Sequence, residues 1–229
     1  MSEIYIYKYL DNLTSKQKLF LFDIFTFKVK KITWDFDQIL FDTETPVKQA
    51  FYIRTKIDYR QRKIDRWLAL STWAKEDGKK VLEDLETAEK DIWKDPLVLK
   101  RAKPIRAMQL YSKMAFLKGV EQSVVTSRES ELSTVTLDGI KKHYDWICEK
   151  DVHIRNDNNV PRDEYKGLTV GEIMPDVHFE DSIDSTSAVL KHSKANVMLF
   201  PRLKERNMFI GDERVVELPD MSMILSLLR

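Results

Sequence analysis

Residues 30–37 read Lys-Lys-Ile-Thr-Trp-Asp-Phe-Asp, and this stretch decides how the rest of the chain is interpreted. Residues 30–36 combine β-branched and aromatic side chains, which favours a strand. Two carboxylates, Asp35 and Asp37, stand at its end. Because a strand points alternate side chains to opposite faces, both aspartates can serve one pocket only if the chain leaves strand geometry at Asp37.

Two later segments have the same form, an apolar strand that ends in reactive polar groups. They are residues 120–126 (VEQSVVT) and residues 176–180 (DVHFE). Any single Asp or Thr can end a strand by capping a turn. Carboxyl ends of parallel strands meet at one edge of a sheet, so the ordered set predicts a shared pocket. Besides Asp35 and Asp37, its members are Thr126, Ser127 and Arg128, then Lys166 between the strands, then Glu180, Asp181 and Ser182.

Strands and helices alternate after Gly119, which predicts an α/β fold with a mostly parallel, Rossmann-like sheet flanked by helices. The further expected strands are residues 152–155 and 196–200, and the expected helices are 129–143, 163–173 and 185–192. A helix over residues 16–27, capped by Thr14 or Ser15, has apolar residues on more than one face. It is expected to dock on the body or on a partner subunit, so a homo-oligomer is possible.

The segment 43–118 predicts a mainly helical insertion between the first two of these strands. The core would then comprise residues 1–42 and 119–229, and Pro96 and Pro104 mark helix boundaries inside the insertion. Residues 43–118 carry 18 Lys or Arg and 11 Asp or Glu, whereas the rest of the chain carries 20 and 26. A basic insertion on an acidic body suits an anionic substrate, although a solvated, salt-bridged helical surface explains the same pattern.

Composition excludes several classes of protein. The net charge of +1 gives no overall attraction to nucleic acid or membrane, and 43% hydrophobic residues are ordinary for a globular protein. The single cysteine, Cys148, cannot form an internal disulfide, and the first residues lack the pattern of a signal peptide. We therefore expect a cytoplasmic protein.

The four ordered motifs resemble those of the haloacid dehalogenase superfamily of phosphatases. These motifs are Asp35-Phe36-Asp37 after an apolar strand, Thr126 at the end of another, Lys166, and Glu180-Asp181 after a third. The resemblance covers roughly residues 30–201. One position departs from the family pattern: Gln38 stands where the family usually has a glycine, which eases a tight turn.

The resemblance implies a role for each residue. Asp35 would be the nucleophile that forms an aspartyl-phosphate, and Asp37 the general acid and base. Asp35, Asp181 and the backbone carbonyl of Asp37 would hold Mg²⁺. Thr126 and Lys166 would contact the phosphoryl group, while Glu180 and Asp184 would support the metal ligands.

A narrower similarity bears on the substrate. Residues 126–130 (TSRES), 153–157 (HIRND) and 175–179 (PDVHF) look like segments of the phosphatase domain of phage polynucleotide kinases, and cytosolic deoxyribonucleotidases share part of the pattern. Ser127, Arg128 and Arg155 are then candidates for substrate contacts. This similarity implies a nucleotide or the phosphorylated end of a polynucleotide as substrate.

The insertion supplies basic and aromatic residues that could bind such a substrate. Basic groups can hold phosphates while aromatic faces stack on bases, but the same tryptophans can instead form the core of the insertion. Two alternatives remain open: a phosphatase of a small non-nucleotide metabolite, or a catalytically silent binding protein on the same fold. The residues concerned are Tyr52, Arg54, Lys56, Tyr59, Arg60, Arg62, Lys63, Arg66, Trp67, Trp73, Lys100, Arg101, Lys103 and Arg106.

Overall fold

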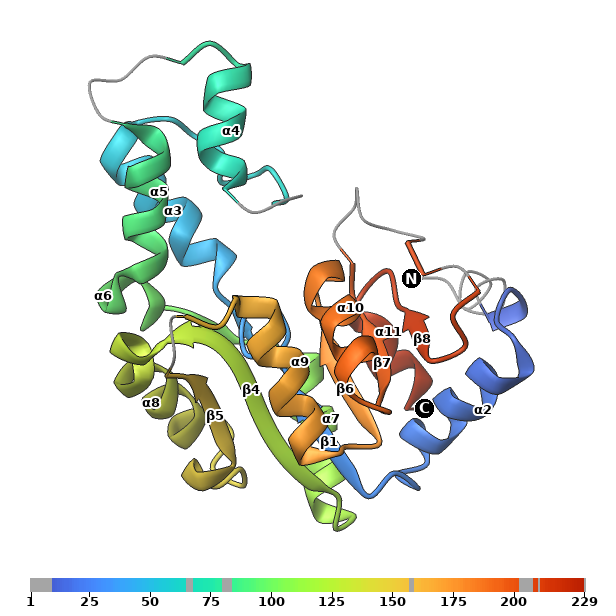
Figure 1. Cartoon of the computed structure of the whole chain (residues 1–229). Helices are drawn as coiled ribbons and strands as arrows, with labels where there is room; N and C mark the ends of the chain where they lie inside the picture. The colour runs from blue at the N-terminus through green and yellow to red at the C-terminus, as the bar shows by residue number, and fades with distance from the viewer. Residues whose placement is uncertain are drawn as a thin grey trace.

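The structure is a computed structural model that describes residues 10–64, 68–79, 84–156, 159–201, 208–209 and 211–228. A six-stranded sheet forms its centre, in the order β5-β4-β1-β6-β7-β8 (Figure 1). All five neighbouring pairs of strands run parallel. The predicted α/β class with a mostly parallel sheet is therefore confirmed.

The strands expected from the sequence are present, with ends shifted by up to three residues. β4 is the longest because it continues past Thr126 through a register shift between Thr126 and Glu129. β8 was not predicted, since only three residues form it. The bounds are β1 Lys31–Trp34, β4 Glu121–Glu129, β5 Val152–Arg155, β6 Val177–Glu180, β7 Asn196–Leu199 and β8 Val215–Glu217.

Helices cover both faces of the sheet. On one face α9 (Arg162–Ile173) and α10 (Ile183–His192) pack through Val170 and Val189 against apolar residues of β4, β7 and β8. On the other lie α2 (Ser15–Phe25), α7 (Arg106–Leu117), α8 (Ser133–His143) and α11 (Ser222–Leu227). Trp34 of β1 and Phe179 of β6 stand at the centre of that side, with ring centroids 4.4 Å apart.

The N-terminal helix packs on the body, which is one of the two arrangements expected from the sequence; the other was packing on a partner subunit. Thr14 caps α2, accepting from the Gln17 N–H, while the Gln17 side chain accepts from the Thr14 N–H. This reciprocal pair is a capping box. Phe20, Leu21 and Ile24 of α2 are buried in the same cluster as Trp34.

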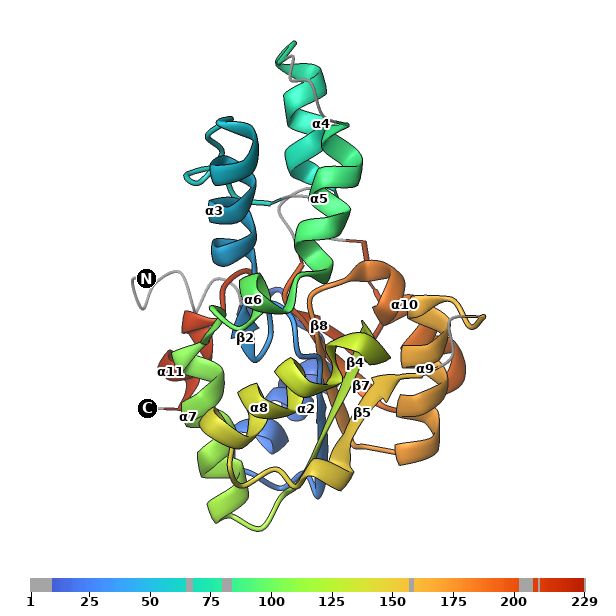
Figure 2. The same cartoon turned by 90° about the vertical axis from the view of Figure 1, so that its left-hand side faces the viewer.

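The insertion is a helical layer that stands above the carboxyl edge of the sheet (Figures 1 and 2). It contains α3 (Glu44–Thr55), α4 (Ala69–Glu76), α5 (Leu85–Lys94) and α6 (Pro96–Leu99), which share their own apolar cluster. Its two connections to the body pair antiparallel, as β2 (Phe41–Asp42) and β3 (Lys103–Pro104).

One helix inside the range 43–118 packs on the body instead. Met108, Tyr111 and Ala115 of α7 belong to the body's cluster, because α7 lies against β4 after the chain has returned through β3.

α3, α7 and α9 each have 12 residues. No helix in the described part of the chain is both long and apolar enough to cross a membrane.

Candidate active site

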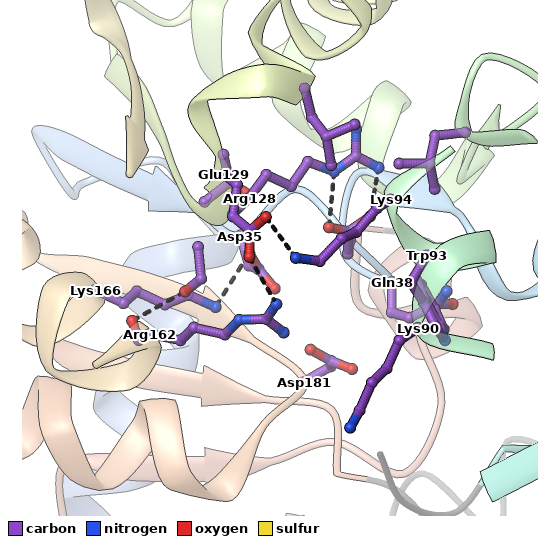
Figure 3. Close-up of a pocket in the computed structure, with 15 residues that line it drawn as sticks. Asp35, Gln38, Lys90, Trp93, Lys94, Arg128, Glu129, Arg162, Lys166 and Asp181 are labelled. Atoms are coloured by element: carbon purple, nitrogen blue, oxygen red, sulfur yellow. Dashed lines mark hydrogen bonds and ion pairs between the residues drawn. The ribbon is translucent and has the colours of Figure 1, made fainter. Parts of the chain in front are cut away.

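A cavity of about 470 Å³ opens where the order of the sheet reverses (Figure 3). β1 lies between β4 and β6, so their three carboxyl ends meet at one point. Open parallel sheets bind ligands at such a switch point. The insertion forms the opposite wall. The lining residues are Asp35, Asp37, Gln38, Lys90, Trp93, Lys94, Leu99, Thr126, Ser127, Arg128, Glu129, Leu132, Arg162, Lys166 and Asp181.

Asp35 lies at the floor of the cavity, directly after β1. Its N–H donates to the carbonyl of Phe179 at 2.9 Å, which keeps it in register with β6. Its side chain is only 6% exposed. The carboxylate oxygen Oδ1 accepts from the Phe36 N–H at 2.8 Å and lies 3.1 Å from Lys166 Nζ. Asp35 is thus held by its own turn and by one buried cation.

Lys166 joins Asp35 to Glu180. Its Nζ, carried by α9, also donates to Glu180 Oε2 at 2.8 Å. Burial lowers the pKa of Lys166, but the charges of Asp35 and Glu180 outweigh burial and raise that pKa above its usual range. Burial acts to raise the pKa of Glu180, yet Lys166 and His178 hold it below its usual range. Lys166 is therefore an ammonium and Glu180 a carboxylate.

All of the hydrogen-bonding positions of Glu180 are occupied. Oε2 accepts from Lys166 and contacts His178 Nε2 at 3.1 Å, while Oε1 accepts from the N–H groups of Asp181 and Ser182. A carboxylate has about four lone-pair sites, so Glu180 has none left for a metal ion. Glu180 instead orients Lys166 and the backbone at Asp181.

The buried cluster has the charge and chemistry of a divalent cation site. Oxygens of Asp35, Glu180 and Asp181 lie within 4.8 Å of one another. Lys166 neutralises only one of these three carboxylates. Burial raises the pKa of Asp35 well above its usual value, more than Lys166 lowers it. Carboxylates are preferred ligands of Mg²⁺. Because Glu180 is saturated, Asp35 and Asp181 are the carboxylates that fit such an ion.

Asp37 is held by an arginine. Arg128 donates from Nε to Asp37 Oδ2 at 2.9 Å and from Nη2 to Oδ1 at 2.7 Å, and its third nitrogen donates to Thr136. The guanidinium carbon also lies 4.2 Å from the centre of the Phe36 ring. We expected Arg128 to contact phosphate. In the structure its guanidinium orients Asp37, while the phosphate contact stays a prediction.

Of the other predicted site residues, some line the cavity and some do not. Thr126 and Ser127 line the cavity, although the Ser127 hydroxyl donates to the carbonyl of Arg162 at 3.0 Å. Arg155 lies behind Glu129, at 3.6 Å, and does not line the cavity. Asp184 is exposed in the first turn of α10, away from the cavity lining.

The insertion contributes a wall of the cavity that the sequence motifs do not predict. Lys90, Trp93 and Lys94 lie on α5 at spacings of three and four residues, so they share one helix face. That spacing was the available signal. Lys94 Nζ lies 2.8 Å from the carboxylate of Glu129, which also lies 3.5 Å from Arg162 (Figure 3). We call Lys90, Trp93 and Lys94 the insertion wall.

Most of the expected basic and aromatic residues of the insertion serve the insertion itself. Tyr59 and Trp73 are buried in its core, with ring centroids 5.6 Å apart. Arg62 covers both rings and pairs with Asp77. None of the expected set that the structure describes lines the cavity, whereas Arg66 and Trp67 lie outside the described residues.

Comparison with solved structures identifies the fold. CbbY from Rhodobacter sphaeroides, solved with phosphate, aligns with a TM-score of 0.54 and 13% identity over 87% of this chain and 99% of that one. A putative phosphatase from Clostridium difficile gives 0.56 and 13%, over 87% and 98%. A putative beta-phosphoglucomutase from Thermotoga maritima gives 0.52 and 17%, over 87% and 98%.

The chain has the haloacid dehalogenase fold. No family model matches its sequence, and a search of curated proteins finds no match either. The fold therefore supports the resemblance that the four short motifs carry. In this haloacid dehalogenase fold, Asp35 and Asp37 stand at the switch point beneath the insertion.

Proposed function

We propose that this protein is a magnesium-dependent phosphomonoester hydrolase that forms an aspartyl-phosphate on Asp35. The observation that supports it most is the buried group of Asp35, Lys166, Glu180 and Asp181 at the floor of the cavity. This group combines a carboxylate, a fixed cation and an acidic pair. Asp37 lies next to it, with both oxygens oriented by Arg128.

The reaction divides into two displacements at phosphorus. In the first, a carboxylate oxygen of Asp35 attacks the phosphorus, the bond to the ester oxygen breaks, and Asp37 gives that oxygen a proton. In the second, Asp37 takes a proton from water, whose oxygen attacks the same phosphorus. The bond to Asp35 then breaks, and inorganic phosphate leaves with the Asp35 carboxylate restored.

The remaining groups compensate charge. Mg²⁺ held by Asp35 and Asp181 would offset the repulsion between an anionic nucleophile and an anionic phosphate. Lys166 provides a positive charge at Asp35 that Glu180 keeps in place. The Thr126 hydroxyl, buried in the lining, can donate to a phosphoryl oxygen.

The insertion wall favours a nucleotide or a phosphorylated polynucleotide end as substrate. Trp93 packs partly buried against the core of the insertion and lines the cavity, where its ring would stack on a base. Lys90 and Lys94, which pair with Glu86 and Glu129, add positive charge beside it. The similarity to polynucleotide kinase phosphatases supports the same class from sequence motifs alone. In this proposal, the insertion wall binds the leaving group of the phosphomonoester, which is the nucleoside or polynucleotide part of the substrate.

A phosphorylated small metabolite is the second candidate substrate. One structural neighbour is named a putative beta-phosphoglucomutase, and a cavity of about 470 Å³ suits a compact molecule. Sugar hydroxyls could hydrogen-bond to charged groups such as Glu129 and Lys94. A panel of nucleotides, 3′-phosphorylated oligonucleotides and sugar phosphates separates the two candidates by kcat/KM.

The test compares the wild-type protein with Asp35→Asn. The wild type should release phosphate from p-nitrophenyl phosphate only with Mg²⁺, and acid quenching should trap a phosphoryl group on the peptide containing Asp35. Asp35→Asn should lose turnover and the trapped phosphoryl group, while its far-UV circular dichroism spectrum stays that of the wild type. Undiminished turnover in this variant would refute the mechanism. If the wild type instead bound nucleic acid without Mg²⁺ and released no phosphate, the catalytically silent binding protein would be favoured.

A further inference from the structure

The residue after the two aspartates adopts a backbone conformation that side chains rarely take. Gln38 has φ of 59°, in the left-handed region that favours glycine. The turn around it is tight: Gln38 N–H donates to the Phe41 carbonyl at 2.8 Å, and Phe41 N–H donates to the Phe36 carbonyl at 3.0 Å. A glutamine therefore occupies this position at some cost in backbone energy, which calls for a compensating contact.

The Gln38 side chain makes that contact with the start of the insertion. Its terminal amide faces two backbone N–H groups, so the oxygen must point toward them. Oε1 then accepts from Glu44 N at 2.7 Å, from Thr43 N at 3.1 Å and from the Thr43 hydroxyl at 2.9 Å. Thr43, the N-cap residue of α3, makes no side-chain capping bond itself. Gln38 caps α3 from outside the helix.

The position of α3 is transmitted to the insertion wall. Val47 and Phe51 of α3 share an apolar cluster with Ile92 of α5, and Arg54 of α3 pairs with Asp91 of α5 at 3.2 Å. Ile92 and Asp91 precede Trp93 directly. A displacement of α3 relative to the body therefore displaces the side chains that form the opposite side of the cavity.

We propose that Gln38 is a positioning residue that fixes α3, and with it the insertion wall, over Asp35 and Asp37. It is well placed for this because it follows Asp37 directly and lines the cavity itself. Its backbone belongs to the loop between β1 and β2 that carries Asp35 and Asp37, which we call the aspartate loop. Its side chain contacts the start of the insertion. A glycine at this position would relieve the left-handed turn but remove the link.

A second cap on the same helix provides a matched control. Asp42 Oδ1 accepts from the Thr45 N–H at 3.0 Å, so it also caps α3, but it belongs to β2 rather than to the aspartate loop. Loss of either cap should loosen the first turn of α3. Only loss of the Gln38 cap should loosen the insertion relative to the aspartates.

The experiment compares variants of equal side-chain length. Gln38→Met removes the acceptor, and Gln38→Glu keeps one. Gln38→Met should speed hydrogen exchange at the amides of Thr43 and Glu44 about five- to tenfold, the size expected for a lost helix cap. Gln38→Glu should exchange at the wild-type rate, whereas Asp42→Ala should speed exchange at Thr45 only. Wild-type exchange rates at Thr43 and Glu44 in Gln38→Met would overturn the proposal.

The position of the insertion is measured with spin labels. Cysteines replace Lys75 on the insertion and Lys141 on the body, both exposed, and Cys148 becomes serine. The distance distribution should broaden in Gln38→Met and stay narrow in Gln38→Glu and Asp42→Ala. Equal broadening in Gln38→Met and Asp42→Ala would show that Gln38 caps a helix and does nothing more.

The effect on specificity rests on the proposed function and is measured separately. In Gln38→Met, kcat/KM for a nucleotide should fall at least fivefold more than kcat/KM for p-nitrophenyl phosphate, since the smaller substrate depends less on the insertion wall. An equal fall for both would overturn the effect on specificity. If the wild type cleaves neither substrate, the proposed function fails, while the exchange and distance measurements still decide the role of Gln38.

Discussion

Both carboxylate oxygens of Asp37 accept hydrogen bonds from Arg128, at 2.7 and 2.9 Å. A planar guanidinium that engages both oxygens fixes the rotation of the carboxylate as well as its position. Arg128 is itself fixed by Thr136 and by the Phe36 ring. Asp37, the proposed general acid and base, is thus already oriented by Arg128 before any substrate binds.

The Asp37–Arg128 pair predicts a dependence on the leaving group. Arg128→Met should lower kcat for an alkyl phosphate about 100-fold, within the range of general acid–base catalysis. The loss on p-nitrophenyl phosphate should be smaller, because p-nitrophenolate leaves without a proton. Arg60→Met, which removes an exposed arginine paired with Asp58, is the control. Equal losses on both substrates with a raised KM would show that Arg128 binds phosphate directly.

The acidic cluster predicts a metal-dependent stability. At a Mg²⁺ concentration 100-fold above Kd, the wild-type melting temperature should rise by about 5–10 °C, and chelation should reverse the rise. Asp181→Asn should lose most of this shift and need at least tenfold more Mg²⁺ for half-maximal activity. Asp184→Asn, at an exposed acid three residues away, should behave as wild type. An unchanged Mg²⁺ requirement in Asp181→Asn would remove Asp181 from the metal site.

Lys166 predicts a large cost for a single substitution. Lys166→Met leaves three buried carboxylates without their cation, and breaking a buried ion pair in this way typically costs about 3–5 kcal/mol. Lys191→Met removes an exposed lysine that pairs with Glu164 and should cost less than about 1 kcal/mol. Urea denaturation with chelator and with Mg²⁺ measures both. A Lys166→Met cost no larger than that of Lys191→Met would contradict the assigned charges.

The insertion wall predicts a loss that depends on the substrate. Trp93→Leu should reduce kcat/KM for a nucleotide about tenfold, since stacking a base on an aromatic ring contributes about 1–3 kcal/mol. The reduction for p-nitrophenyl phosphate should be smaller. Lys75→Met, on the exposed surface of α4, should alter neither value. If Trp93→Leu impairs sugar phosphates and spares nucleotides, the small-metabolite candidate is the better one.

The body of the fold was predictable because its elements carry strong local patterns. Residues 30–36 combine β-branched and aromatic side chains, residues 196–200 are mostly apolar, and Thr14 or Ser15 is a predicted cap at the start of α2. β8 escaped prediction because three residues carry too little pattern. α7 has the helical spacing of the insertion, so its packing against the body could not be read from the sequence.

The alternation of strands and helices, and the order of the reactive residues, follow from local patterns along the chain. Strand ends in a parallel sheet meet at one edge, so Asp35, Thr126 and Asp181 could be grouped without coordinates. Which side-chain atoms are in contact depends on the folded arrangement of the whole chain. This arrangement saturates Glu180, turns Arg128 toward Asp37 and joins Gln38 to α3. The physical reason is that side-chain hydrogen bonds need fixed distances and directions across segments far apart in sequence, and spacing along one segment contains no record of them.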